Sequence, residues 1–256
     1  MTARTFAIGD IHGDLEHLEA LLAKLPGLTG DDTLVFMGDY VDRGPDSAGV
    51  VRRLMALPDA TPAQVVCLRG NHEDGWLRAI SGDWPQFVFP VHNGCLQAME
   101  SFLGRPISPL GNMPEPGDFE HLVKGDFFPP EVLAWMGALR WWYEDEHAIY
   151  VHAGLPDDDQ GGFLHPSEAT GKAQSALLWL RSRRFFEDYR GKPVIFGHTV
   201  TGDLPPELST YTPEDHDDLW AGPAVLGIDT GCGKGGFLTA VELPTMLVYE
   251  SRARQS

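Results

Sequence analysis

The chain has little cysteine and little positive charge. Its 256 residues include only Cys67, Cys95 and Cys232, an odd and widely separated set that argues against a disulfide framework. Lysine and arginine total 19 against 37 aspartate and glutamate residues, which leaves a net charge of −18. Binding to a nucleic-acid backbone or an anionic membrane needs clustered lysine and arginine, so we expect neither as a partner.

Long apolar runs and targeting signals are also missing. No apolar run approaches the ~18 residues of a membrane span, and no positively charged head precedes an apolar stretch at the N-terminus. We therefore expect a cytoplasmic protein. The sequence has no internal repeat, and 256 residues that are 43% hydrophobic can bury a full core, so we expect a single domain over residues 1–256.

What the chain does contain is a series of short motifs that each follow an apolar, strand-like run. In chain order they are Gly9-Asp10-Ile11-His12-Gly13, Gly38-Asp39-Tyr40-Val41-Asp42-Arg43-Gly44, Gly70-Asn71-His72-Glu73, Val151-His152-Ala153-Gly154 and Gly197-His198-Thr199. In sheets with parallel strands, sites lie beyond the carboxyl ends of the strands. We therefore expect these loops to converge on one site.

The spacing of apolar residues predicts an α/β fold. Runs 5–8, 33–37 and 65–68 are typical of strands, and leucines at helical spacing follow the first of them. The last forty residues change to short strand-like pieces, which suggests a second sheet packed on the first. Residues 74–146 carry no metal-binding signature but are rich in tryptophan and proline, and we interpret them as a helical cap whose aromatics mainly pack.

The residue types in these motifs are those of a paired-metal site. Two ions held roughly 3.5–4 Å apart acidify a bridging water and offset charge on a phosphoryl group, which favours hydrolysis of a phosphate ester by direct attack of bridging hydroxide. Asp39 is the candidate bridging carboxylate. Mixed carboxylate, amide and imidazole ligands suit manganese, with iron or zinc as alternatives. The candidate ligands are Asp10, His12 and Asp39 for the first ion, and Asp39, Asn71, His152 and His198 for the second.

Further residues complete the expected chemistry. His72 follows Asn71 and is the candidate general acid, with Asp42 orienting it and raising its pKa. Arg43 is the candidate phosphate clamp because guanidinium matches phosphate oxygens bidentately. Arg181 is the candidate second clamp, with Arg183 and Arg184 as alternatives.

These motifs, in this order, resemble the phosphoprotein phosphatase family of calcineurin-like metallophosphoesterases, and the chain length resembles its small bacterial and phage-type serine/threonine phosphatases. The resemblance implies a sandwich of two packed mixed β-sheets flanked by helices, and phosphomonoester hydrolysis on phosphoserine and phosphothreonine in proteins. Asp42-Arg43 and Glu73 are similar to the protein phosphatases, whereas symmetrical diadenosine tetraphosphate hydrolases tend to carry other residues there.

Two alternatives remain. One is hydrolysis of nucleotide polyphosphates such as diadenosine tetraphosphate, or of small phosphate esters. The other is a non-catalytic binding scaffold, which ranks last because every expected ligand and the acid are present.

Overall fold

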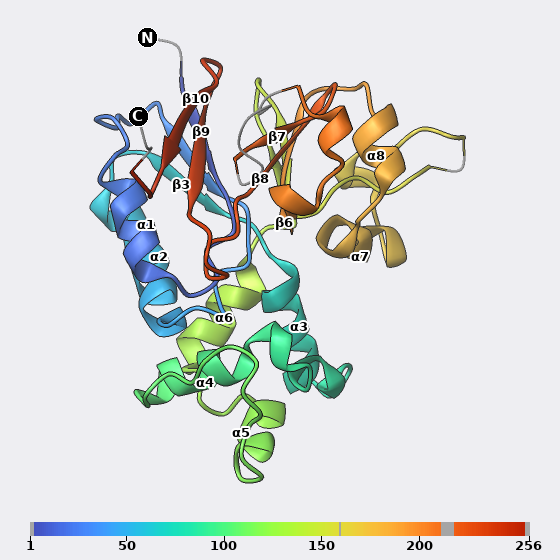
Figure 1. The fold of residues 1–256 in the computed structure, drawn as a ribbon. Helices are drawn as coiled ribbons and strands as arrows, with labels where there is room; N and C mark the ends of the chain where they lie inside the picture. Colours follow the sequence, from blue (N-terminus) through green and yellow to red (C-terminus); the bar gives the residue numbers. More distant parts are fainter. Residues whose placement is uncertain (1–2, 159, 211–217, 254–256) are drawn as a thin grey trace.

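The protein is built around two β-sheets, each with helices on its outer face (Figure 1). We describe residues 3–158, 160–210 and 218–253 in a computed structural model. Each sheet mixes parallel and antiparallel neighbours, which confirms the expected sandwich of two mixed sheets.

The first sheet has the order β10-β9-β1-β2-β3. Strands β1, β2 and β3 run parallel, and β9 pairs antiparallel with β1. Connections between the parallel strands pass through α1 and α2, as the leucine spacing predicts for the first of them. The elements are β1 (Thr5–Ile8), α1 (Leu15–Leu22), β2 (Thr33–Phe36), α2 (Ser47–Ala60), β3 (Gln64–Cys67), β9 (Thr239–Leu243) and β10 (Leu247–Glu250).

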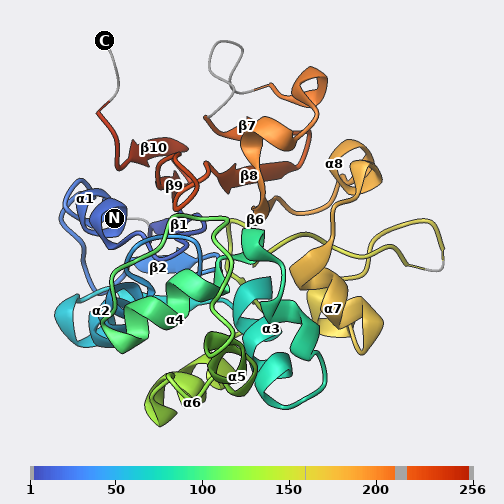
Figure 2. The same ribbon diagram turned by 60° about the horizontal axis from the view of Figure 1, so that its bottom comes forward.

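The second sheet has the order β4-β5-β6-β8-β7. Its parallel centre is β5-β6-β8, and the edge strands β4 and β7 are antiparallel to their neighbours. Helices α7 and α8 lie on its outer side, away from α1 and α2 (Figure 2). The elements are β4 (Trp142–Glu144), β5 (Ile149–Val151), α7 (Lys172–Trp179), α8 (Arg183–Asp188), β6 (Val194–Val200), β7 (Trp220–Ala221) and β8 (Val225–Asp229).

Strand alternation explains how the sheets pack. In β1, Ala7 faces the second sheet in a shared apolar cluster with Tyr150 and Ile195, whereas Phe6 and Ile8 face the helices. Successive side chains of a strand point to opposite faces, so a strand covered on both sides must be apolar throughout. All four residues of β1 and of β2 are buried accordingly.

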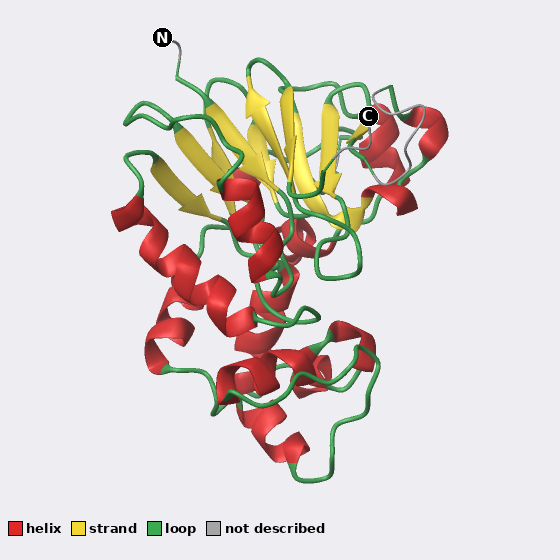
Figure 3. Ribbon diagram, turned by 60° about the vertical axis from the view of Figure 1, so that its left-hand side comes forward, coloured by secondary structure: helices red, strands yellow, loops and turns green. Residues whose placement is uncertain are grey.

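A helical segment follows β3 and lies beyond the ends of the strands (Figure 3). Its helices share one apolar core with the outer face of the first sheet. Its bounds differ from the expected 74–146. The first helix begins earlier, at Asn71, and the last ends earlier, at Ala138, because the chain then enters the second sheet at β4. Its helices are α3 (Asn71–Ile80), α4 (Cys95–Leu103), α5 (Asp118–Lys124) and α6 (Pro130–Ala138), with 3-10 turns at Pro85–Val88 and Val91–Asn93.

The expectation that the last forty residues form the second sheet is wrong in part. Of the strands described in this stretch, β7 and β8 belong to the second sheet, whereas β9 and β10 return to the first sheet and extend it beyond β1. Apolar alternation identifies a strand but carries no information about its neighbour, because pairing is decided by contacts far apart in sequence.

Two further expectations concern the thiols and the membrane. Cys67, Cys95 and Cys232 are all free thiols, in line with the absence of a disulfide framework. Across the described ranges, every helix is too short or too polar to cross a bilayer.

Candidate metal centre

The candidate ligands stand at the ends of neighbouring strands from both sheets. Asp10 and His12 follow β1, Asp39 follows β2, and Asn71 opens α3 after β3. From the second sheet, His152 directly follows β5. The apolar run before His198 predicts a strand that ends at Phe196. In the structure β6 continues to Val200, so His198 lies inside the strand. The pairing of β6 with β8 shifts register between Phe196 and Val200, and this irregularity surrounds His198.

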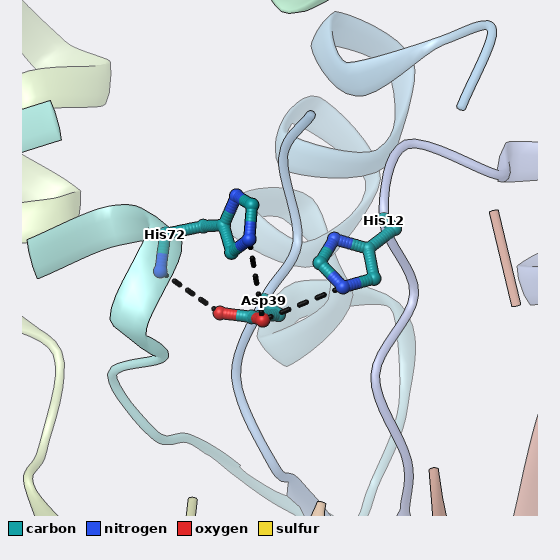
Figure 4. Close-up of side chains that lie close together, drawn as sticks. All are labelled: His12, Asp39 and His72. Atoms are coloured by element: carbon teal, nitrogen blue, oxygen red, sulfur yellow. Dashed lines mark hydrogen bonds and ion pairs between the residues drawn. The ribbon is translucent and has the colours of Figure 1, made fainter. Parts of the chain in front are cut away.

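Asp39 is shared between two clusters of ligand-type atoms. Its Oδ2 lies 3.4 Å from Nε2 of His12 and 3.9 Å from Nε2 of His72 (Figure 4). Its other oxygen, Oδ1, lies 3.5 Å from Nε2 of His152. Two groups of side chains could therefore hold an ion. One group is His12, Asp39 and His72, and the other is Asp39, His152 and His198. A carboxylate whose oxygens face different clusters has the geometry of a bridging ligand.

Asn71 joins the second cluster. Its Oδ1 lies 2.9 Å from Nε2 of His152 and 2.7 Å from Nδ1 of His198. The opposite ring nitrogen of His152, Nδ1, lies 2.8 Å from the carbonyl oxygen of Met37, a contact that orients the ring with Nε2 directed at the centre. The structure therefore brings Asp39, Asn71, His152 and His198 together as expected.

Asp10 lies at the same centre, but its hydrogen bond is to the backbone of His198 and not to another ligand side chain. Its Oδ2 accepts a hydrogen bond from the backbone N–H of His198 at 2.9 Å, and its Oδ1 is buried without a hydrogen-bond partner. A buried carboxylate oxygen normally has a partner, and a cation would supply one here. Asp10 falls outside the two groups named above, where His72 stands beside His12 in its place.

The electrostatics of the centre suit a divalent cation. Burial lowers the pKa of His12, His72 and His198 well below the usual range, and the nearby Arg43 adds to the effect. These imidazoles are therefore neutral at pH 7, the form that binds metal. Burial raises the pKa of Asp10, and the charges of Asp229 and Asp39 raise it further. A cluster of buried carboxylates and neutral imidazoles is short of positive charge, which metal ions would provide.

Backbone strain is concentrated at this centre. Within residues 3–158, 160–210 and 218–253, six non-glycine residues have positive φ, and only Met246 among them lies outside the motifs. Such conformations cost on the order of 1–3 kcal/mol each and persist where surrounding structure enforces them. They turn the loops sharply so that side chains from consecutive positions reach the centre. The motif residues are His12, Asp39, Asp42, Arg43 and His198.

His72 and Asp42 form a buried pair. Nδ1 of His72 lies 2.6 Å from Oδ2 of Asp42, and the indole Nε1 of Trp76 donates to Oδ1 of Asp42 at 2.9 Å. Asp42 thus orients the ring of His72 and leaves Nε2 facing Asp39. The expected rise in the pKa of His72 is wrong for the metal-free protein, because burial and the charge of Arg43 lower that pKa. Trp76 packs as expected, but its hydrogen bond to Asp42 was missed because nothing in the sequence links residues 34 positions apart.

Both candidate phosphate clamps lie at the mouth of the centre. A cavity of about 380 Å³ opens over Asp39 and is lined by Arg43 and Arg181. Nε of Arg181 lies 3.2 Å from Nε2 of His198. The alternatives are engaged elsewhere, since Arg183 pairs with Glu187 and Glu207, and Arg184 with Asp157. The remaining lining residues are Asn71, His72, His92, Asn93, Trp179 and His198.

Glu73 stabilises the loops that carry the candidate ligands. Its carboxylate is fully buried and accepts hydrogen bonds from the backbone N–H groups of Asp39, Tyr40 and Gly70 at 3.0, 2.8 and 2.9 Å. The sequence places Glu73 in a motif but says nothing of these contacts. The carboxylate holds the second and third motif loops together.

Comparison with known proteins agrees with this geometry. The family model described as calcineurin-like phosphoesterase matches residues 3–202. The chain belongs to this family. Together with the ligand clusters, the assignment makes it a metal-dependent phosphoesterase.

Two curated relatives match over almost the whole chain. Each is named symmetrical bis(5′-nucleosyl)-tetraphosphatase and is 28% identical, covering 96% of this chain and 94% of the relative. One is from Acidovorax sp. (strain JS42) and the other from Acidovorax ebreus (strain TPSY).

Solved structures share the fold at low identity. The crystal structure of a putative diadenosine tetraphosphatase matches with a TM-score of 0.57 and 22% identity, over 98% of this chain and 93% of that chain. A protein serine/threonine phosphatase from Saccharomyces cerevisiae matches with a TM-score of 0.52 and 16% identity, over 100% and 81%. At these identities the likeness concerns the fold alone.

Proposed function

We propose that this chain is a phosphoesterase with a paired-metal centre that cleaves nucleoside polyphosphates of the bis(5′-nucleosyl) type. The observation that carries the paired centre is the position of Asp39, whose two oxygens face different ligand clusters at 3.4 Å and 3.5 Å. The chain contributes a ligand set for two divalent ions: Asp10, His12, Asp39, Asn71, His152 and His198. When bound, the ions supply Lewis-acid charge and an activated water.

The remaining residues bind the phosphate and move a proton. Arg43 and Arg181 line the cavity from different loops and are placed to donate to phosphoryl oxygens. His72 would act as the general acid in its protonated form, which the negative charge of a bound phosphate favours relative to the metal-free protein, while Asp42, 2.6 Å from its Nδ1, fixes the ring. Protonation of the departing group matters most when that group is a poor one, such as an alkoxide.

The relatives favour a bis(5′-nucleosyl) polyphosphate as the substrate. Both full-length curated matches are named symmetrical bis(5′-nucleosyl)-tetraphosphatase. The cavity of about 380 Å³ falls within the roughly 300–1,000 Å³ range of small-molecule sites and has room for the reacting phosphates. The net charge of −18 makes the two arginines at the cavity the local attraction for a polyanion.

A second candidate is the hydrolysis of phosphoserine and phosphothreonine in proteins. The feature that favours it is the Asp42 and Glu73 pattern, which resembles protein phosphatases, and both residues are engaged at the centre through His72 and Asp39. A cavity of about 380 Å³ also has room for the phosphate of a phosphorylated side chain.

The test is a side-by-side assay with manganese. Diadenosine tetraphosphate and a phosphothreonine peptide are compared by kcat/KM, and nucleotide products are identified by chromatography. The proposal expects a higher kcat/KM for the dinucleotide, cleaved symmetrically into two molecules of ADP. A higher kcat/KM for the peptide would assign the second candidate. The Asp39→Asn variant serves as the blank, and no turnover of either substrate by the manganese-loaded protein would reject both.

A further inference from the structure

A charged pair outside the residues assigned so far lies at the end of β8. Asp229 is the last residue of that strand, and its side chain is 0% exposed. Its Oδ2 accepts a hydrogen bond from Nζ of Lys234 at 3.1 Å, and its Oδ1 accepts one from the N–H of Gly231 at 3.0 Å. A buried carboxylate is costly without a cation, so Lys234 compensates the charge of Asp229.

The pair lies next to Asp10 and His12, which with Asp39 are the candidate ligands of the first ion and are called the first half-site below. Asp229 pairs with Val200 of β6, two residues after His198, whose backbone N–H donates to Oδ2 of Asp10 at 2.9 Å. The residue before Asp229 contacts the residue before Asp10, since a Cβ on Gly9 would lie 2.3 Å from the backbone oxygen of Ile228. The loop between Asp229 and Lys234 packs directly on His12, since a Cβ on Gly233 would lie 2.4 Å from the backbone oxygen of His12.

We propose that Lys234 is a positioning residue that acts through Asp229 to set the negative charge around Asp10 and His12, and thereby the affinity of this half-site for a divalent cation. The inference rests on the paired-metal centre proposed above. Lys234 is itself only 23% exposed, so water screens its charge incompletely. Its removal leaves Asp229 uncompensated beside Asp10, and a cation is attracted more strongly.

Opposite changes in the pair give opposite effects on metal affinity. The metal-free protein is titrated with Mn²⁺ by calorimetry at pH 8 and low ionic strength, without substrate. Lys234→Met is expected to lower the Kd of one of two binding steps by about three- to tenfold, and Asp229→Asn to raise it by a similar factor. The double variant removes both charges and restores the wild-type Kd. Lys234→Arg keeps the charge and the affinity.

A matched control is Lys124→Met. Lys124 pairs with Glu120 on α5, its side chain is 58% exposed, and its loss changes net charge equally but leaves both Kd values unchanged. Circular dichroism verifies that each variant is folded. If Lys234→Met and the double variant both weaken Mn²⁺ binding, the pair only supports the loop and the proposal is overturned. An unchanged Kd in Asp229→Asn would also overturn it. A wild-type protein that binds no Mn²⁺ would instead reject the metal centre itself.

Discussion

The carboxylate of Glu73 accepts a hydrogen bond from the backbone N–H of Asp39 at 3.0 Å, so the third motif holds the loop that carries the shared carboxylate of the second. The same carboxylate receives the N–H of Tyr40 at 2.8 Å and that of Gly70 at 2.9 Å. The positive φ of Asp39, 54°, is maintained by these contacts.

Replacement of Glu73 by Gln should therefore destabilise the metal-free protein. The glutamine amide has only one acceptor oxygen for these N–H donors, and its NH₂ group would face N–H groups that it cannot bond. Each buried unsatisfied donor costs about 1–3 kcal/mol. Urea denaturation measures the loss in the free energy of unfolding. Glu120→Gln on the exposed face of α5 is the control and should change it little. Equal stability of Glu73→Gln and wild type would show that the loop does not depend on this carboxylate.

Replacement of Asp39 by Asn should prevent paired metal binding. Asn offers one oxygen acceptor where the carboxylate presents Oδ2 to His12 and Oδ1 to His152. Elemental analysis after manganese loading is expected to find two ions per wild-type chain and at most one in Asp39→Asn. Asp10→Asn is the comparison and should lose only the ion of its own half-site. Full metal content in Asp39→Asn would exclude a bridging role.

Replacement of His72 by Asn should separate proton transfer from metal binding. The variant is expected to keep its metal but to lose about 10²–10⁴-fold in rate on an alkyl phosphate, and much less on 4-nitrophenyl phosphate, whose leaving group needs no proton. Asp42→Asn should show the same leaving-group trend, since Oδ2 of Asp42 fixes the ring at 2.6 Å. Loss of metal on His72→Asn would instead make His72 a ligand, in keeping with its place in the first cluster.

Replacement of Arg181 by Ala should weaken substrate binding. Arg181 lines the cavity beside His198, and a charge-assisted hydrogen bond worth about 1.5–3 kcal/mol corresponds to a rise in KM of roughly ten- to a hundredfold. Arg183→Ala removes a nearby guanidinium that pairs with Glu187 and Glu207 instead, and should leave KM unchanged. Steady-state kinetics on one substrate decide the matter, and similar KM values for Arg181→Ala and wild type would remove Arg181 from the clamp.

A stability prediction concerns Asp32, far from the centre. Hydrogen bonds from Arg4 lower the pKa of Asp32 from 3.8 to about 2. A depressed carboxyl pKa stabilises the fold above the unfolded value and ceases to do so as pH falls through the folded value. Asp32→Asn should thus lower the unfolding free energy by about 1 kcal/mol at neutral pH, with partial exposure of Arg4 limiting the effect.

The difference between Asp32→Asn and wild type should shrink as pH falls below about 5 toward the folded pKa. Urea denaturation between pH 3 and pH 7 measures it. A difference that is constant over this range would mean that Asp32 is not linked to folding through its ionisation.

Local sequence determined the strands and the residues that follow them. Apolar runs with strand-like composition predict β1, β2 and β3, and the polar motif residues Asp10, Asp39 and Asn71 follow the ends of these runs. The grouping of Asp10, Asp39 and Asn71 was predictable from strand order, since they follow the neighbouring parallel strands β1, β2 and β3, which end at one edge of the first sheet.

Only the tertiary structure decided relations between segments distant in the chain. The return of β9 to the first sheet, the hydrogen bond of Trp76 to Asp42 and the position of Lys234 beside Asp229 at the first half-site all depend on packing. Local propensity is a property of a few consecutive residues, whereas a contact between Asp39 and His152, at 3.5 Å, requires two sheets to meet. The motifs therefore specify which chemical groups are available, and the packing of the sheets specifies which of them act together.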